Sequence, residues 1–484
     1  MRICRLQAWS TITPSTVSAT GSASRWPATA EAAVDSEQQQ VSSTSRRVWQ
    51  LAWPTILSNL LFTTVGFTHI KIVSGLGNSA VAAVTSGHRI FFLVQAVLMG
   101  VSIATTAMVA RNWGARKLAE AELVAWTSLA IGLAVAILLS MPVIFAPLAV
   151  ASVFGLDAET TQQIASFIFW LGVFNIFTAI NMLLSTALRA TGDVITPLLF
   201  LTASSLFNVT FAYCLAHGIG FLPALGVPGV AFGGSLAGAI VTSVFAAVWW
   251  RGKFNIKAVK QWRIDLASAR QLISIGAPSV LEQGFIQIAF LAFFAIVARY
   301  GTAPYAAYGI GISIVAFSIV VGFGFGIAAA TLVGQQLGAG NPEQAKQAGW
   351  RGLRMALAAM SLFSVLLAVF ARDLAGFMIE DEATINLTVT FIYIIAVAQP
   401  VMAVDITLSG ALRGAGDTRF PLLATVCGIV FGRLLPALAC LALGLPIEAV
   451  FTVMLLDYLI KSSMLLVRYR SGKWLGLRSA GGGT

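Results

Sequence analysis

Ionisable side chains inside long apolar stretches are the residues of this chain most able to do chemistry. Each is costly to bury in lipid unless it faces a partner or a water-filled cavity. The chain holds seven such residues: His69, Lys71, Arg89, Glu282, Asp405, Arg433 and Asp457. An eighth ionisable residue, Lys461, lies nearer the end of its stretch.

Glu282 is the strongest candidate for ion binding. It follows Pro278 by four residues in PSVLEQGF, and Gln283 and Gln287 lie beside it. A carboxyl group at membrane depth can hold and release a proton, or bind a cation once it is ionised. We expect Glu282 to couple ion movement or to bind substrate, with structural hydrogen bonding as the alternative. The same two interpretations stay open for Asp405, the second such carboxylate.

The remaining charges in these stretches suggest structural roles. Lys71 and Arg89 lie toward the outer side, so we expect their long side chains to reach the membrane interface. Arg433 and Asp457 lie on the last two stretches and can pair with each other. We expect a structural ion pair there, with a functional pair as the alternative.

The motifs of an enzyme are missing from the sequence. There is no GxxxxGK[ST] phosphate-binding loop, and the three histidines are too scattered for an active site. The glycines from Gly322 to Gly326 lie inside an apolar stretch, where glycine favours close helix packing. The four cysteines show no metal-ligand spacing. We therefore expect no catalysis, no disulfide, no metal and no cofactor.

Composition indicates that helices in a membrane position these residues. The chain is 58% hydrophobic and 10% charged, whereas soluble domains are about 25% charged. Apolar stretches of about 20 residues, the length that crosses a bilayer, recur between short loops. We expect an all-α membrane protein with twelve spans, near residues 50–74, 79–108, 121–148, 162–187, 194–217, 228–250, 272–298, 304–333, 350–371, 384–411, 420–443 and 447–467.

An internal duplication divides the twelve spans into two sets of six. A shift of 224 residues aligns LSTALRATGDVITPLL at 184–199 with LSGALRGAGDTRFPLL at 408–423 without a gap. The same shift places Pro54 on Pro278 and Gly114 on Gly338. Two like halves predict two six-helix lobes that face each other across a central space.

The repeated LRxxGD motif, which a proline follows, predicts a tight turn at the end of a span. The glycine permits the turn and the aspartate can cap the next helix. The arginine, Arg189 or Arg413, can bind the last carbonyl groups of the helix before it. We interpret this motif mainly as architecture.

The basic residues predict the orientation. Most of the 30 Lys and Arg lie in loops after even-numbered spans or after the last span. Basic loops favour the cytoplasm, so we expect both termini there and both halves inserted the same way. The net charge of +11 then faces lipid headgroups and indicates no nucleic acid.

These patterns give five segments. They are a tail at 1–45, an N-terminal lobe at 46–250, a basic linker at 251–271, a C-terminal lobe at 272–470 and a second tail at 471–484. The first tail is rich in Ser, Thr and Ala and has no acid before Glu31. A disordered tail, a start codon assigned too early and an organellar transit peptide all fit it.

These features together resemble the multidrug and toxic compound extrusion (MATE) family, over about residues 46–470. The duplicated lobe, ALRATGD, ALRGAGDTRFP, the loops NWGARKLAEA and QLGAGNPEQAKQA, and GVPGVAFGG from Gly226 carry the resemblance. It implies a V-shaped pair of six-helix bundles that exchange organic, often cationic, compounds for protons or sodium. The chain looks closest to the DNA-damage-inducible F branch.

The resemblance also implies roles for site residues. Many members of that branch carry an Asp in the first helix, used in proton coupling, and the matching position here is His69. An imidazole titrates near neutral pH and can relay protons, although it cannot serve as an anionic ligand. Glu282 and Asp405 are similar to the acids that the sodium-using branch carries in its seventh and tenth helices. Their positions within those two helices differ from the positions in that branch. We expect Asp405 and His69 as secondary coupling residues.

We predict a secondary antiporter that exports small organic molecules. It would be a monomer in the plasma membrane, most simply the bacterial inner membrane, or in an organellar membrane if residues 1–45 are a transit peptide. We expect polar cavity liners at Asn175, Asn181, Asn208, Gln283, Gln287 and Gln399. The alternatives are a lipid-linked precursor flippase of the same superfamily and a membrane scaffold or sensor that transports nothing. The substrate stays open.

Overall fold

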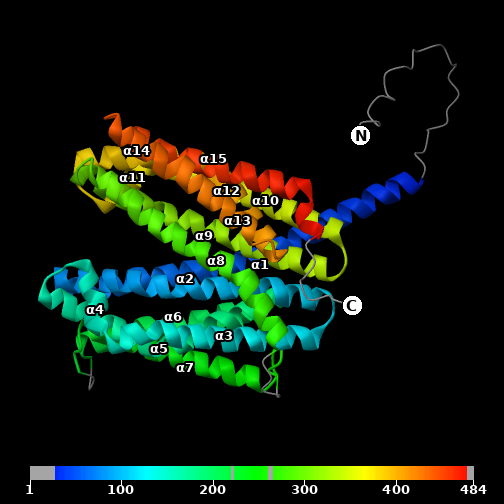
Figure 1. Ribbon diagram of the computed structural model, residues 1–484, viewed down its shortest axis with the longest axis horizontal. Coiled ribbons are helices and arrows are strands. Elements are labelled where there is room, and N and C mark those ends of the chain that lie inside the picture. Colours follow the sequence, from blue (N-terminus) through cyan, green and yellow to red (C-terminus); the bar gives the residue numbers. More distant parts are fainter. Residues whose placement is uncertain (1–27, 220–222, 260–264, 477–484) are drawn as a thin grey trace, which may run out of the picture. The chain divides into compact units, whose positions relative to one another are not determined.

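In the computed structural model, residues 28–219, 223–259 and 265–476 are described, and every regular element in them is a helix (Figure 1). Twelve of these helices are long and apolar enough to cross a membrane. The predicted all-α fold with twelve spans is therefore confirmed. Contacts divide the chain into Met1–Thr44 and Ser45–Thr484, and every contact described below lies within the second unit. Most of the predicted tail at 1–45 lies outside the described residues.

Each half of the chain supplies six spans. Those of the first half are α1 (Ala28–Val73), α2 (Asn78–Gly114), α3 (Leu118–Phe145), α5 (Ala158–Thr191), α6 (Ile195–His217) and α7 (Val227–Trp250), with the short α4 (Pro147–Ala151) and η2 (Ser152–Phe154) after α3. Those of the second half are α8 (Leu266–Ala298), α9 (Thr302–Gly338), α10 (Pro342–Val369), α12 (Glu382–Gly414), the run α13 (Arg419–Cys427), η3 (Gly428–Leu434) and α14 (Leu435–Ala442), and α15 (Ile447–Ser471), with the short α11 (Ala371–Met378) after α10.

The helices of each half pack mainly on one another. In the first half, α5 packs on α2, α3 and α7, and α6 packs on α7. In the second half, α12 packs on α9, α10 and α15. Figure 1 shows the blue-to-green helices α2 to α7 on one side and the green-to-red helices α8 to α15 on the other. The chain thus forms two helical lobes.

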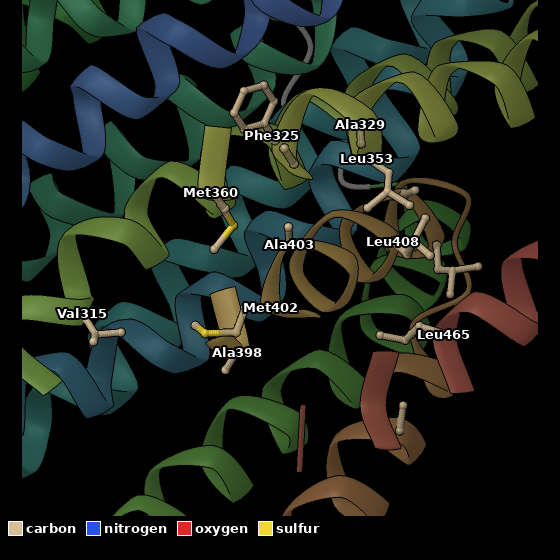
Figure 2. Packing of buried hydrophobic residues seen from close by; sticks show 14 of the residues in the cluster. Val315, Phe325, Ala329, Leu353, Met360, Ala398, Met402, Ala403, Leu408 and Leu465 are labelled. Atoms are coloured by element: carbon tan, nitrogen blue, oxygen red, sulfur yellow. The ribbon is translucent and has the colours of Figure 1, made fainter. Parts of the chain in front are cut away.

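The largest buried apolar cluster lies mainly in the C-terminal lobe, and Val48, Leu51 and Ala52 of α1 join it. Its residues from α9, α10 and α12 include Phe325, Met360, Met402 and Leu408, and Leu465 joins from α15 (Figure 2). Small residues such as Ala329 and Ala403 lie among them, which lets neighbouring helices come close. This core holds the helices that carry most of the buried charges.

The two lobes meet at α2 and α9. A Cβ added to Gly114 of α2 would overlap the backbone of Gln335 in α9, and one added to Gly338 of α9 would overlap the backbone of Arg111. The shift of 224 residues relates 111 to 335 and 114 to 338. The two helices therefore cross in a pseudo-twofold arrangement, and glycine at both places lets their backbones touch.

A second pair of glycines repeats this arrangement farther along the same helices. A Cβ on Gly100 of α2 would overlap Val280 of α8, and one on Gly324 of α9 would overlap Ile56 of α1. These residues are again related by 224 positions. We call the contacts of α2 with α8 and α9, and of α1 with α9, the lobe seam. The glycines from Gly322 to Gly326 thus serve close helix packing, as expected.

The two LRxxGD turns have the same backbone conformation but differ in their side-chain contacts. Gly192 and Gly416 adopt φ of +101° and +90°, which favours glycine. Asp193 accepts a hydrogen bond of 3.0 Å from the backbone N–H of Thr196, as predicted for a helix cap. Asp417 instead accepts a hydrogen bond of 2.8 Å from Arg468 of α15. The second turn is therefore tied to the last helix.

Candidate functional site

Glu282 is buried in the C-terminal lobe, with 2% of its surface exposed. Its Oε1 accepts a hydrogen bond of 2.6 Å from Nη2 of Arg413 and one of 2.8 Å from the hydroxyl of Thr425. Its Oε2 has no partner. A single carboxylate thus connects α8 with α12 and α13, and its second oxygen is buried without a hydrogen-bond partner.

Arg413 belongs to the second LRxxGD motif, where we expected it to bind helix carbonyl groups. Instead, its guanidinium binds the carboxylate of Glu282 across the lobe. Charge pairing explains the difference, because an ionised carboxylate at this depth needs a cation and Arg413 is the cation within reach. The sequence places Arg413 in the turn just after the predicted span 384–411, so it gave no direct signal for this contact.

A second charged group lies between η3 and α15. Arg433 forms an ion pair with Asp457, and Lys461 lies 3.0 Å from the same carboxylate. The guanidinium also lies over the rings of Phe293 and Tyr458. The Arg433–Asp457 contact expected from the sequence is present, and Lys461 adds a second cation to it.

The segment that carries Arg433 is a π-helix, η3. Such turns are rare and frequently occur at functional sites. Gly428 and Gly432 line its contact with α15, because a Cβ on either would come too close to Asp457. The π-helix therefore places Arg433 against the carboxylate of Asp457, with which it forms an ion pair.

Asp405 of α12 is half-buried, and among the described residues it has no hydrogen bond. It lies near enough to Lys461, Asp457, Glu282 and Arg413 for their charges to act on it. The structure thus gathers both candidate carboxylates, Glu282 and Asp405, in one charged region of the C-terminal lobe.

His69 belongs to a separate polar group in the N-terminal lobe. Its Nε2 lies 2.7 Å from Oδ1 of Asn208 in α6, and its Nδ1 lies 3.4 Å from Nε2 of His88 in α2. The two imidazole rings stack at 5.5 Å. The Asn208 amide donates to the carbonyl of Gly234 in α7. Four helices therefore meet at this histidine pair.

Sequence reasoning missed His88, because it treated the three histidines as too scattered to act together. His69 and His88 lie on antiparallel neighbouring helices joined by a short connection around Gly77, so they come to the same depth. The sequence did contain a signal for this contact, because the two histidines lie at similar numbers of residues before and after the predicted turn between the first two spans.

The predicted cavity liners have mixed surroundings. Asn175 donates to the hydroxyl of Ser140 and the carbonyl of Ala136, and Asn181 donates to Thr242. Gln399 is fully buried and neither of its amide atoms has a partner. Gln283 is buried and Gln287 is half-buried beside Glu282 in sequence. The N-terminal amides thus serve contacts within their lobe, while Gln399 keeps its hydrogen-bonding capacity.

Among the described residues, no three His, Cys, Asp or Glu side chains gather as ligands for a metal ion. The charged groups of the C-terminal lobe combine carboxylates with arginine and lysine, and the histidine pair has an amide partner. Such groups can hold and release protons or bind charged ligands.

The halves of the chain also match a known family. A model of the MatE family fits residues 54–214 and again residues 278–438, two segments that differ by the same 224 positions. The chain belongs to the multidrug and toxic compound extrusion (MATE) family. This MATE chain is therefore a multi-pass membrane transporter, as its twelve spans indicate.

Relatives and solved structures resemble the MATE chain over most of its length. It is 24% identical over 442 residues to a probable multidrug resistance protein NorM of Thermotoga maritima, covering 90% of this chain and 94% of the relative. It is 28% identical over 397 residues to a NorM of the same description from Bradyrhizobium diazoefficiens, covering 78% and 83%. A transporter of the MOP superfamily from Pyrococcus furiosus superposes with a TM-score of 0.83 at 19% identity, covering 88% and 95%.

Proposed function

We propose that this MATE chain is a multidrug efflux antiporter. It exports small organic compounds in exchange for protons or sodium by alternating access. The observation that carries the proposal is the buried Glu282–Arg413 pair, whose carboxylate keeps one oxygen without a partner. The names of the NorM relatives support the export of drugs. Membership of the DNA-damage-inducible F branch stays a prediction.

The Glu282 carboxylate links ion binding to helix position. While ionised, it accepts hydrogen bonds from Arg413 and Thr425 and so connects α8 to α12 and α13. A proton on the carboxylate would remove its charge and leave the Arg413 guanidinium without a counter-ion. A sodium ion at the oxygen without a partner would compete with Arg413 for the same negative charge. Either ion weakens the link between these helices, which is what coupling requires.

The histidine pair offers the N-terminal lobe a second place to hold a proton. One neutral imidazole can donate to the other, and a proton added to either would place a positive charge beside Asn208. We include His69 and His88 as secondary coupling residues, and Asp405 as the corresponding residue of the C-terminal lobe.

The lobe seam fits the proposed orientation. Its closest crossing lies at the Gly114 end of α2, next to Arg111, Arg116 and Lys117. Basic ends favour the cytoplasm, so the described arrangement is closed on the cytoplasmic side and both termini lie there. Opening of the seam would be the second half of the alternating-access cycle.

The test uses the full chain in proteoliposomes with imposed pH or sodium gradients and ethidium as the transported probe. Glu282→Gln should abolish gradient-driven flux at normal expression. Glu382→Gln, which alters a surface pair with Arg372, is the matched control and should transport normally. Normal flux through Glu282→Gln would remove this residue from the mechanism. A wild-type chain that moves labelled lipid instead would be a flippase, and one that moves nothing would be a scaffold.

A further inference from the structure

A cavity of about 450 Å³ lies at the end of α2 opposite the Gly114 crossing. Six of its lining residues come from one helix, α2, and two come from the connection after α4: Asn78, Val81, Ala82, Thr85, Ser86, Arg89, Phe154 and Leu156. In the proposed orientation this end of α2 faces outward, where substrate would leave.

The cavity opens on the face of α2 that meets the other lobe. Arg89 precedes Gly100 by 11 residues, which is about three helical turns, so the two share one face. Gly100 packs on Val280 of α8. The cavity therefore lies on the same face as the lobe seam, about 16 Å farther along α2. All of its lining residues belong to the N-terminal lobe, so a ligand here would be held by that lobe alone.

Arg89 is a charge without a counter-ion. Its side chain is exposed to the cavity, and among the described residues it has no ion pair or hydrogen bond. The acids at membrane depth do not supply one, because Glu282 pairs with Arg413 and Asp457 pairs with Arg433 and Lys461. No acid lines the cavity.

The polar neighbours of Arg89 are also free to bind. Thr105 and Thr106 of the same helix donate to the carbonyl four residues before each. Thr85 and Ser86 form no such bond, and Asn78 has none either, among the described residues. Two hydroxyls and an amide thus accompany the guanidinium. The matching positions of the C-terminal lobe carry no charge, since Arg89 corresponds to Ser313.

We propose that this cavity binds the carboxylate of the exported compound, so that the substrates include organic acids and zwitterions. A guanidinium matches a carboxylate with two parallel hydrogen bonds, and hydroxyl groups can donate to the remaining lone pairs. Phe154 and Leu156 supply the apolar wall that an organic skeleton needs. That the bound acid is also a substrate rests on the proposed export function.

The binding test uses three probes that share one fluorescent ring. They are 7-diethylaminocoumarin-3-carboxylic acid, its methyl ester and its trimethylammonioethyl amide. Anisotropy titrations with the full chain in phosphatidylcholine nanodiscs should show the acid binding at least about tenfold more tightly than the ester or the cation. Arg89→Gln should remove this preference, and Arg89→Lys should keep part of it. Lys71→Gln is the matched control, since Lys71 is exposed on the outer end of α1 and outside the cavity.

Several outcomes would overturn the proposal. Equal affinity of the wild type for acid and ester would do so, as would an unchanged preference in Arg89→Gln. Loss of acid binding in nanodiscs that contain phosphatidylglycerol would show that Arg89 holds a lipid headgroup instead.

Flux measurements separate this inference from the proposed function. If the cationic probe crosses proteoliposomes and the acid does not, export stands and the carboxylate site falls. If the acid binds through Arg89 and no probe crosses under any gradient, the site stands and the export function falls.

Discussion

The buried charges of this chain are unevenly shared between its two lobes. Glu282, Asp405 and Asp457 all lie in the C-terminal lobe, and their register partners in the N-terminal lobe are Ser58, Asn181 and Gly233. The N-terminal lobe has a histidine pair with an amide partner instead. The acids to which the proposed function assigns ion coupling therefore lie in the C-terminal lobe.

The Glu282–Arg413 pair should be sensitive to the loss of either partner. Arg413→Gln leaves a buried carboxylate without its cation, which costs about 3 to 5 kcal/mol when such pairs are broken. We expect thermal unfolding in detergent at a clearly lower temperature than for the wild type. The double variant Glu282→Gln with Arg413→Gln removes both charges and should recover most of the loss.

The pair Arg372–Glu382 is the control for this double-mutant cycle of Glu282 and Arg413, because its side chains are 66% and 68% exposed. Arg372→Gln should change stability by no more than about 1 kcal/mol. A double variant as unstable as the sum of the two single variants would show that Glu282 and Arg413 do not interact energetically.

At this scale the sequence predicts which residues are unusual and the Arg433–Asp457 pair of adjacent spans, but not the partners of Glu282 and His69. The depth of Glu282 follows from the apolar run around it. Its contact with Arg413 depends on how α8 and α12 rotate about their axes, and these positions are 131 residues apart. The same applies to His69 and Asn208, separated by 139 residues. Hydrophobicity fixes the depth of a residue, whereas packing fixes its partner.

Among the elements, α5, α8 and α12 each begin directly after an aspartate that caps them. Asp157, Asp265 and Asp381 accept hydrogen bonds at the starts of α5, α8 and α12. The sequence predicted the spans from their apolar runs, but α8 begins six residues before the expected 272. Ser268, Arg270 and Gln271 interrupt the apolar run before 272, and the cap at Asp265 determines where the helix starts.

The cap at Asp381 predicts a pH dependence. The hydroxyl and the backbone N–H of Thr384 donate to its carboxylate and lower the pKa of Asp381 below its usual range. A lowered pKa means that this stabilisation is present above about pH 4 and is lost as the pH falls through the folded-state value. Asp381→Ala should therefore lower the unfolding temperature at pH 7, and its difference from the wild type should shrink below about pH 4.

Thermal unfolding of both proteins between pH 3 and pH 7 measures this difference. Glu380→Ala changes the neighbouring acid outside the cap and should show no such trend. A difference between Asp381→Ala and the wild type that stays constant over the whole range would contradict the assignment.

For the whole molecule, the duplication predicts the architecture well. The shift of 224 residues gave two six-helix lobes, and the same register recurs in the contacts between them. The detailed seam could not be predicted, because a glycine in a membrane helix marks close packing without naming the helix it approaches. Gly114 and Gly100 lie on the same helix, yet one meets α9 and the other α8.

The seam yields a prediction about closure. Gly338→Ala places a methyl group against the backbone of Arg111, so the Gly114 ends of the lobes should move apart. Spin labels at Lys117→Cys and Asn341→Cys, which are register partners beside the crossing, report this separation. Double electron–electron resonance should show a shift of the distance distribution to longer values.

Gly309→Ala is the matched control in the same helix, because a Cβ there has no neighbour within 4 Å. It should leave the distance distribution unchanged. The same distribution for Gly338→Ala and the wild type would mean that the crossing does not hold the lobes together.

The π-helix in the eleventh span stores one extra residue. Its hydrogen bonds close over five residues instead of four, so conversion to an ordinary α-helical turn would release that residue into the neighbouring helix. Such a slip would turn Arg433 by about 100° around the axis and carry its guanidinium away from Asp457. Lys461 would then remain as the counter-ion. The slip would thus leave Asp457 with one counter-ion in place of two, without unwinding the eleventh span.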